Sequence, residues 1–473
     1  MIRPATALKR SKRWLIHWKT VSHDTASSPI WLMIVCIGTL CSQNTFWWQP
    51  LLTVALFLVC YYFWHKRTPT KGRYIPLLFN EAFLLRHYLS PGLESRFTCS
   101  NPKEDLPHIL KHLRQRVQQM ALFNPWLCGY LKTNCGIPSI WTDETQPSID
   151  RLFYEIRVDD PCDMELVLTQ QTSVEIGAKV LNTNKPFLKI CVVYSPECHD
   201  YYVTVCVTHM VGEPNLLYQL WGMLASNAPI VPLWADRHHS YKKHPLTALK
   251  GAARGKFLYY FLSSQASIFR TIWAGHQHSK DQPQPILHRR YVNMEWVQKK
   301  KEAYQKRRSE LDGSPSYVST QDVLTTWFFS QLKPSCVCVA YSLHDRAEYV
   351  TMQHMGNYLE ALVLFPDEYS NPGHVRRAVA TAGEWAPVNN RSGRDDYSAG
   401  LVTGWHSRYV DLELPRSTRQ THLPLRGAMF TGMIPRVLPC MCLFRTSRDQ
   451  FAVVTLSQEE LLDRSAFGDP VKL

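Results

Sequence analysis

The clearest pattern of apolar and polar positions lies between residues 188 and 224. Leu188–Tyr194 and Tyr201–Val207 are runs rich in Val, Cys and Tyr, and a polar Ser-Pro-Glu-Cys-His-Asp sequence separates them. Two such runs joined by a short polar turn predict a β-hairpin. After Pro214, leucines recur at helical spacing as far as Leu224, which predicts a helix. A loop at 208–213 therefore joins the second strand to the helix.

His209 lies in this loop, and Glu213 follows it four residues later. A rigid junction between a strand and a helix can hold a histidine as a general base. The spacing alone does not select His209, because His344 and Glu348 have the same spacing. A structural histidine is the alternative interpretation.

A second periodic segment precedes the hairpin. Its apolar residues recur every three or four positions and predict a buried helix face: Leu106, Ile109, Leu110, Leu113, Val117 and Met120. Asn124–Leu131 then breaks this helix and opens a strand, and residues 151–187 contain further strand-like runs. These elements predict a soluble α/β domain that begins near residue 74.

The N-terminal part of the chain predicts a membrane anchor. Pro29–Trp64 contains no charged residue, and basic residues flank it on both sides. The stretch exceeds the roughly 20 residues of one span and falls a little short of two spans with a turn. Two basic flanks favour two cytosolic ends, so we expect a helical hairpin at residues 29–66 behind a basic cytosolic segment, 1–28. One long tilted helix with the catalytic domain outside, or a buried soluble helix, are the alternatives.

Composition narrows the class of protein. An apolar fraction of 45% with 15 Trp, 22 Tyr and 19 Phe excludes a disordered chain. The net charge of +14 suits nucleic acid, an anionic membrane or a phosphate-bearing substrate. No nucleic-acid recognition module is evident, so we expect no nucleic-acid partner. The 14 cysteines show no paired CxxC spacing, so we expect reduced thiols and no metal.

Residues 241–311 separate the two halves of the soluble part. Residues 257–273 are apolar and aromatic with basic residues before them, which fits either an interfacial helix or a crossover helix packed on the core. A basic helical run from Trp296 contains Lys299 and Lys300. It is either a solvated face or a contact for a CoA phosphate or a lipid headgroup.

The order of these elements resembles the CoA-dependent acyltransferase superfamily. The helix, Asn124–Leu131, the two strands and the histidine with its acid look like the first half of that family, which includes chloramphenicol acetyltransferase, wax-ester synthases and BAHD enzymes. Tyr317–Leu324, Val339–Arg346 with Gly356-Asn357, and Thr403-Gly404-Trp405 before Asp411 resemble the second half. The resemblance covers roughly residues 75–460.

The chain departs from the family pattern at three points. The family's His-x-x-x-Asp-Gly is His209-x-x-x-Glu213-Pro214 here, and Thr208 replaces the histidine that some groups have before it. The Asp-Phe-Gly-Trp-Gly motif keeps only Asp411. Glutamate preserves the charge but adds a methylene, and a shift near 1 Å can cost about a hundredfold in rate.

The resemblance implies a two-lobed channel with His209 at its middle. His209 would take the acceptor proton, and the acceptor would attack the thioester of acyl-CoA directly. Glu213 would support the loop, with Arg346 as its ionic partner. Thr403 is a candidate for stabilising the oxyanion. Further substrate-binding candidates are Asn357, Trp405, Lys299 and Lys300.

We therefore expect a membrane-bound acyl-CoA-dependent O-acyltransferase, monomeric and without a bound cofactor. Its acyltransferase lobes would comprise residues 74–240 and 312–473, and it would face the cytosol from the endoplasmic reticulum membrane. The anchor favours a hydrophobic acceptor, such as a long-chain alcohol, diacylglycerol, sterol or terpenoid. The alternative is an inactive relative that serves as a membrane-anchored binding or scaffold protein.

Overall fold

The computed structural model describes residues 72–78, 80–84, 90–143, 147–239, 286–308, 315–334, 336–346, 349–380, 399–425 and 439–471. The chain divides into two compact units, and the larger comprises Arg73–Lys132 and Ser139–Leu473. The candidate site described below lies entirely within this larger unit.

The first large sheet has five strands in the order β12-β2-β7-β6-β5. They are β2 (Gly92–Cys99), β5 (Phe153–Arg157), β6 (Leu188–Tyr194), β7 (Asp200–Val207) and β12 (Ser417–Pro424). The predicted hairpin is confirmed: β6 and β7 pair antiparallel, with Leu188 opposite Val207 and Tyr194 opposite Tyr201. Seven of the eight residues of β7 are buried, so this strand lies at the centre of the lobe.

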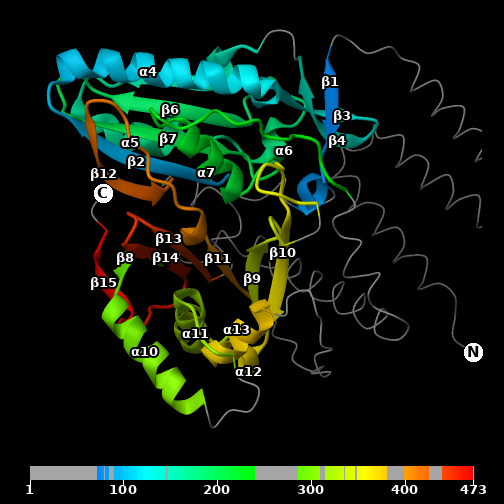
Figure 1. The fold of residues 1–473 in the computed structure, drawn as a ribbon, viewed down its shortest axis with the longest axis vertical. Coiled ribbons are helices and arrows are strands. Elements are labelled where there is room, and N and C mark those ends of the chain that lie inside the picture. Colours follow the sequence, from blue (N-terminus) through cyan, green and yellow to red (C-terminus); the bar gives the residue numbers. More distant parts are fainter. Residues whose placement is uncertain are drawn as a thin grey trace, which may run out of the picture. The chain divides into compact units, whose positions relative to one another are not determined.

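Among the described residues, the two longest helices of this lobe pack against the sheet (Figure 1). The periodic segment forms α4 (Pro102–Phe123), whose buried face includes Leu106, Ile109, Leu113, Val117 and Met120. Asn124 ends α4, because its backbone N–H donates to Met120 O and Pro125 follows. The helix after the histidine loop is α7 (Pro214–Met223), which begins at a proline in its first turn.

The second large sheet has seven strands in the order β10-β9-β11-β13-β14-β8-β15. These strands are β8 (Ile286–Val292), β9 (Cys336–Ser342), β10 (Leu359–Leu364), β11 (Ala399–Gly404), β13 (Cys440–Arg445), β14 (Phe451–Ser457) and β15 (Phe467–Pro470). The helices of this lobe are α10 (Met294–Arg307), α11 (Thr320–Leu332), α12 (Pro366–Tyr369) and α13 (Pro372–Ala380). Ser319 and Asp322 form a capping box that starts α11.

Shorter elements complete the described part. A small sheet has the order β1-β4-β3 and contains β1 (Arg73–Pro76), β3 (Tyr130–Asn134) and β4 (Ile137–Thr142). The short helices are η1 (Asn80–Leu84), η3 (Pro125–Cys128), η4 (Ile149–Arg151), η5 (Pro161–Asp163), α5 (Met164–Gln171), α6 (Gly177–Val180) and η7 (His406–Arg408).

The sheets do not follow the expected division of the chain at residues 240 and 311. β8, which lies in the expected crossover, belongs to the second sheet and pairs with β14. β12 comes from the C-terminal half but pairs with β2 of the first sheet. The C-terminal half therefore contributes a strand to the first sheet and completes its edge.

The expected membrane hairpin at residues 29–66 lies outside the described residues, and so does the apolar run at 257–273. Within the described ranges, the helices include none that is both long and apolar enough to cross a bilayer.

Candidate active site

His209 lies directly after β7, in a loop whose backbone is fixed at both ends. Thr208 donates its N–H to Phe187 O at 2.8 Å, and Val211 N–H donates to Thr208 O at 2.9 Å. The ring of His209 is half-buried, and its Nδ1 lies 3.2 Å from Gly212 O. A carbonyl only accepts, so Nδ1 carries the hydrogen and Nε2 becomes the proton-accepting nitrogen of the neutral ring.

Burial lowers the pKa of His209 below its ordinary value of 6.5, and the nearby charge of Glu213 opposes part of that effect. A histidine with a lowered pKa is neutral at pH 7. The neutral ring in this tautomer has the form that a general base needs.

Glu213 is buried immediately before α7, and its partner comes from the second lobe. Its Oε1 lies 2.7 Å from Nδ1 of His344, and the two side chains are 3% and 0% exposed. Ser342 Oγ lies 3.4 Å from the same carboxylate oxygen. The other ring nitrogen of His344, Nε2, donates to His354 O at 2.8 Å. The acid of the motif thus joins α7 to the loop after β9.

The expected pair between Glu213 and Arg346 is wrong. Strand β9 ends at Ser342, and the chain then turns, with Arg346 N–H donating to Leu343 O at 3.0 Å. Asp345 takes a left-handed conformation in this turn, at φ 58°. Arg346 is therefore exposed, and its guanidinium lies beside the ring of Tyr341. His344, two residues earlier, is the residue that reaches Glu213.

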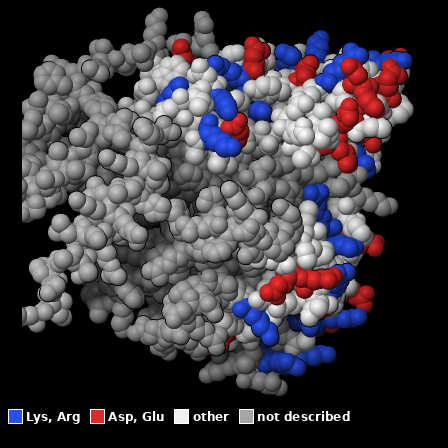
Figure 2. Space-filling view, turned by 180° about the vertical axis from the view of Figure 1, so that it is seen from behind, with Lys and Arg blue, Asp and Glu red and all other residues white. Residues whose placement is uncertain are grey.

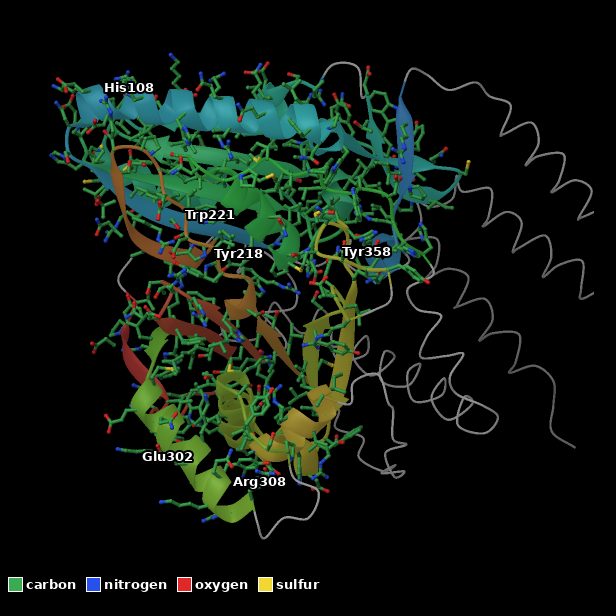
Figure 3. The ribbon with its side chains drawn as sticks, in the orientation of Figure 1. His108, Tyr218, Trp221, Glu302, Arg308 and Tyr358 are labelled. Atoms are coloured by element: carbon green, nitrogen blue, oxygen red, sulfur yellow. The ribbon has the colours of Figure 1, made fainter. Side chains whose placement is uncertain are left out.

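Asn357 contacts the backbone of the histidine loop, and the substrate-binding role expected of it stays a prediction. Its Nδ2 donates to His209 O at 2.7 Å, and its backbone carbonyl accepts from Asn80 Nδ2 at 2.7 Å. The preceding Gly356 has φ +138°, which an L side chain rarely adopts. Figure 3 shows the adjacent Tyr358 in the loop that precedes β10, beside η1.

Sequence reasoning missed a buried ion pair beside this loop. Glu81 of η1 and Arg237 pair through Oε2 and Nε at 3.0 Å, and both side chains are 0% exposed. Glu81 also accepts from the backbone N–H of Asn357 at 2.8 Å. Neither residue lies in a recognisable motif. Glu81 lies in an apolar run, while Arg237 follows Asp236 and precedes two histidines, and signals of this kind are too common to select either residue.

The remaining predicted residues occupy other parts of the fold. Thr403 lies on β11, and its hydroxyl accepts from Trp405 Nε1 at 3.2 Å. Trp405 is 4% exposed and belongs to the main hydrophobic core. Both residues thus have structural contacts of their own, and the oxyanion and substrate roles expected of them stay predictions.

Lys299 and Lys300 lie on α10, which Figure 3 shows well away from Tyr358. Lys299 pairs with Glu295 one turn earlier at 2.7 Å, with both side chains largely exposed. The Lys300 ammonium lies 5.3 Å from the ring centre of Trp296. Figure 2 shows acidic side chains among the Lys and Arg side chains on the described surface seen from behind. These contacts are typical of a solvated helix face.

The comparisons with known proteins find similar structures but no similar sequences. No family model and no curated protein matches the chain. TRI101 of F. sporotrichioides, solved with coenzyme A and T-2, has a TM-score of 0.52 at 13% identity over 83% of this chain and 96% of that one. TRI101 of F. graminearum, solved with coenzyme A and deoxynivalenol, has a TM-score of 0.50 at 14% identity over the same shares. Vinorine synthase has a TM-score of 0.52 at 13% identity over 83% of this chain and 92% of that one.

The chain therefore has the mixed α/β fold of TRI101 and vinorine synthase, and the α/β part of the expected fold is confirmed for the described residues. At these identities the similarity establishes the fold alone.

Proposed function

We propose that the protein is a membrane-bound acyltransferase that moves an acyl group from acyl-CoA to the hydroxyl of a hydrophobic acceptor. The observation that carries the proposal is the state of His209. It is a neutral, half-buried histidine whose Nδ1 is fixed by Gly212 O, in a fold shared with CoA-dependent acyltransferases. The similar TRI101 structures hold coenzyme A, which supports acyl-CoA as the co-substrate.

In the proposed reaction, His209 Nε2 takes the proton from the acceptor hydroxyl as its oxygen attacks the thioester carbonyl. A C–O bond forms, and a tetrahedral oxyanion results. The C–S bond then breaks, and the departing CoA thiolate takes the proton from the imidazolium. Acyl-CoA and alcohol become ester and CoA, so neither an acyl-enzyme nor a bound cofactor is required.

The acceptor class follows from the sequence rather than from the site. The uncharged stretch Pro29–Trp64 with its basic flanks supports an anchor in the endoplasmic reticulum membrane, with the acyltransferase domain in the cytosol. Such an enzyme meets substrates dissolved in the bilayer. A long-chain alcohol, diacylglycerol, a sterol or a terpenoid alcohol would each fit this location.

The test uses membranes from cells that express the full chain. Acetyl-, octanoyl- and palmitoyl-CoA are each combined with hexadecanol, dioleoylglycerol, cholesterol and geranylgeraniol, and the release of free CoA thiol is measured. We expect thiol release and ester formation with at least one pair. His209→Ala should lower that rate by roughly 10²–10⁴-fold at equal expression, since general base catalysis contributes that much.

Arg346→Ala is the matched control, because Arg346 is exposed and away from Glu213. It should keep the wild-type rate. A His209→Ala protein with unchanged turnover would overturn the proposed mechanism. A folded protein without turnover on any pair would favour the inactive scaffold instead.

A further inference from the structure

We propose that Glu81 and Arg237 are positioning residues: their buried ion pair holds the backbone of the His209 loop and so sets the place of the catalytic ring. The inference deepens the function proposed above and rests on it. It assigns to this pair the supporting role that the resemblance gave to an arginine paired with the acid of the histidine motif.

The pair has the two-pronged geometry of a strong carboxylate–guanidinium contact. Arg237 Nε lies 3.0 Å from Glu81 Oε2, and Arg237 Nη2 lies 3.2 Å from Glu81 Oε1. The partners are 156 positions apart in the chain, and both side chains are 0% exposed. Two parallel charge-assisted bonds fix relative orientation as well as distance. The pair can therefore act as a rigid clamp.

Neither charge is left unsatisfied in the interior. Glu81 Oε2 accepts from Leu78 N–H at 2.7 Å, and Oε1 accepts from Asn357 N–H at 2.8 Å. Arg237 Nη1 donates to Ala235 O at 2.7 Å. A buried ion pair persists only where further hydrogen bonds satisfy both groups. The network meets that condition and also ties three distant segments together.

The clamp reaches the histidine loop at two carbonyl groups. Arg237 Nη2 donates to Val211 O at 2.9 Å. Asn357 Nδ2, which lies 3.2 Å from Glu81 Oε1, donates to His209 O at 2.7 Å. The first carbonyl belongs to the peptide unit directly after His209, and the second belongs to the unit between Val211 and Gly212, so the loop is held at two places. The side chain of His209 leaves the backbone at the Cα directly before the first of these carbonyls.

The same loop then fixes the tautomer of the ring. His209 Nδ1 meets the carbonyl of Gly212, the residue next to Val211. A shift of Val211 would move this carbonyl and release Nδ1. The carbonyl that Arg237 holds is thus directly coupled to the contact that makes Nε2 the basic nitrogen. This coupling is the reason to assign the pair a positioning role in addition to a structural one.

The test measures His209 itself in the purified full chain. Diethyl pyrocarbonate reacts with neutral imidazole nitrogen, and the rate of His209 carbethoxylation is followed by peptide mass spectrometry. The variants are Glu81→Gln, which removes one charge, and Arg237→Lys, which keeps the charge but loses the fork. We expect His209 to react several-fold faster in both, because the loop no longer confines the ring.

Turnover is measured in parallel with the acyl-CoA and acceptor pair that the wild type uses. We expect kcat to fall by about a hundredfold, the effect of a displacement near 1 Å, with KM for acyl-CoA little changed. If the wild type shows no turnover, the proposed function fails, while the modification rate still tests the clamp. The two failures are therefore distinguishable.

Asp322→Asn is the matched control. Asp322 is also buried and pairs with an arginine, Arg376, at 2.7 Å, but it caps α11 in the second lobe. It should lose stability and leave the reaction of His209 unchanged. If the Glu81→Gln protein does not fold, the modification rate of the Arg237→Lys protein tests the proposal. Wild-type modification rates in the folded variants, or an equal increase in Asp322→Asn, would overturn the proposal.

Discussion

His422 is a fully buried histidine that bridges two hydroxyl groups in the first lobe. Its Nδ1 lies 2.9 Å from Ser95 Oγ, and its Nε2 lies 3.1 Å from Tyr218 OH. Burial lowers its pKa to about 3, and the positive charge of Arg419 adds to this effect. A hydroxyl can donate or accept, so the neutral ring is satisfied at both nitrogens. Figure 3 shows Tyr218 beside Trp221 on the same helix.

We predict that this histidine makes the protein less stable in acid. Its native pKa lies below the unfolded value near 6.5, so its contribution is complete above pH 6.5 and is lost as the pH falls toward 3. Within that window each pH unit removes about 1.4 kcal/mol of unfolding free energy. Denaturant titrations from pH 7 to pH 4 should give a shallower pH dependence for His422→Gln than for the wild type. Parallel slopes would contradict the assignment.

Gly356 is the residue whose backbone brings Asn357 to the histidine loop. A Cβ at this position would lie 3.0 Å from Arg237 Nε and 3.2 Å from Glu81 Oε1, and φ is +138°. We predict that Gly356→Ala lowers the unfolding free energy by about 1–3 kcal/mol, the usual cost of such backbone strain. Chemical denaturation measures this effect.

Gly222 provides the control, because it lies in α7 and its Cβ would meet only Val410 Cγ1 at 3.4 Å. Gly222→Ala should be neutral or stabilising by up to about 1 kcal/mol through helix propensity. Equal losses in both variants would show that the backbone at Gly356 has no special role.

At the scale of elements, the contact between the Glu213 carboxylate and the His344 ring joins the start of α7 to the end of β9. Both side chains are buried and 2.7 Å apart. We predict that Glu213→Ala and His344→Ala each cost about 3–5 kcal/mol, since either leaves a buried polar partner unmatched. The double variant should lose much less than the sum of the two.

The measurement is a double-mutant cycle of unfolding free energies. Arg346→Ala, which changes the exposed neighbour of the same turn, should stay within about 0.5 kcal/mol of the wild type. Losses that simply add for Glu213 and His344, or a large loss for Arg346→Ala, would favour the pairing expected from the sequence.

The elements that the sequence predicted are those with a strong local period. β6 and β7 alternate or are continuously apolar, and α4 repeats its buried face every three or four residues. The sequence of each element therefore shows which of its residues are buried. His209 and Glu213 lie in the short loop that joins two such elements. The partner of Glu213 could not be predicted in the same way. His344 and Arg346 both follow β9, and only the turn at Asp345 determines which of them faces inward.

Contacts between segments that are distant in the chain could not be predicted from the sequence. Glu81 and Arg237 meet across 156 positions, and the sequence around neither residue identifies the other as its partner. β12 has an ordinary strand pattern, and its pairing with β2 depends on the completed first sheet. Pattern reasoning therefore finds strands and helices, while strand order and buried ion pairs require the tertiary structure.

At the scale of the molecule, strand β12, which the C-terminal half contributes to the first sheet, makes the two lobes interdependent. The chain leaves the second sheet after β11, adds β12 to the first sheet beside β2, and returns as β13. Ser417 faces Cys99 and Pro424 faces Leu93 in this pairing. The His422 contacts with Ser95 and Tyr218 strengthen the same junction. The lobes that carry His209 and His344 thus share a sheet edge in addition to the contact between Glu213 and His344.

The last prediction concerns how the whole chain meets the membrane. The uncharged stretch Pro29–Trp64 has basic residues on both sides, which favours an entering and returning hairpin. We predict that the full chain resists carbonate extraction and that tags at Met1 and Leu473 are both digested by protease added to sealed microsomes. Its matched variant replaces residues 30–64 with a Gly/Ser linker of equal length and should move to the supernatant, because the apolar area that holds it in the bilayer is gone.

Three other outcomes would change this prediction. If the linker variant stays with the membrane, the aromatic run at 257–273 is a second membrane contact. A protected N-terminal tag with a digested C-terminal tag would replace the hairpin by a single span, and extraction of the full chain by carbonate would exclude an integral anchor.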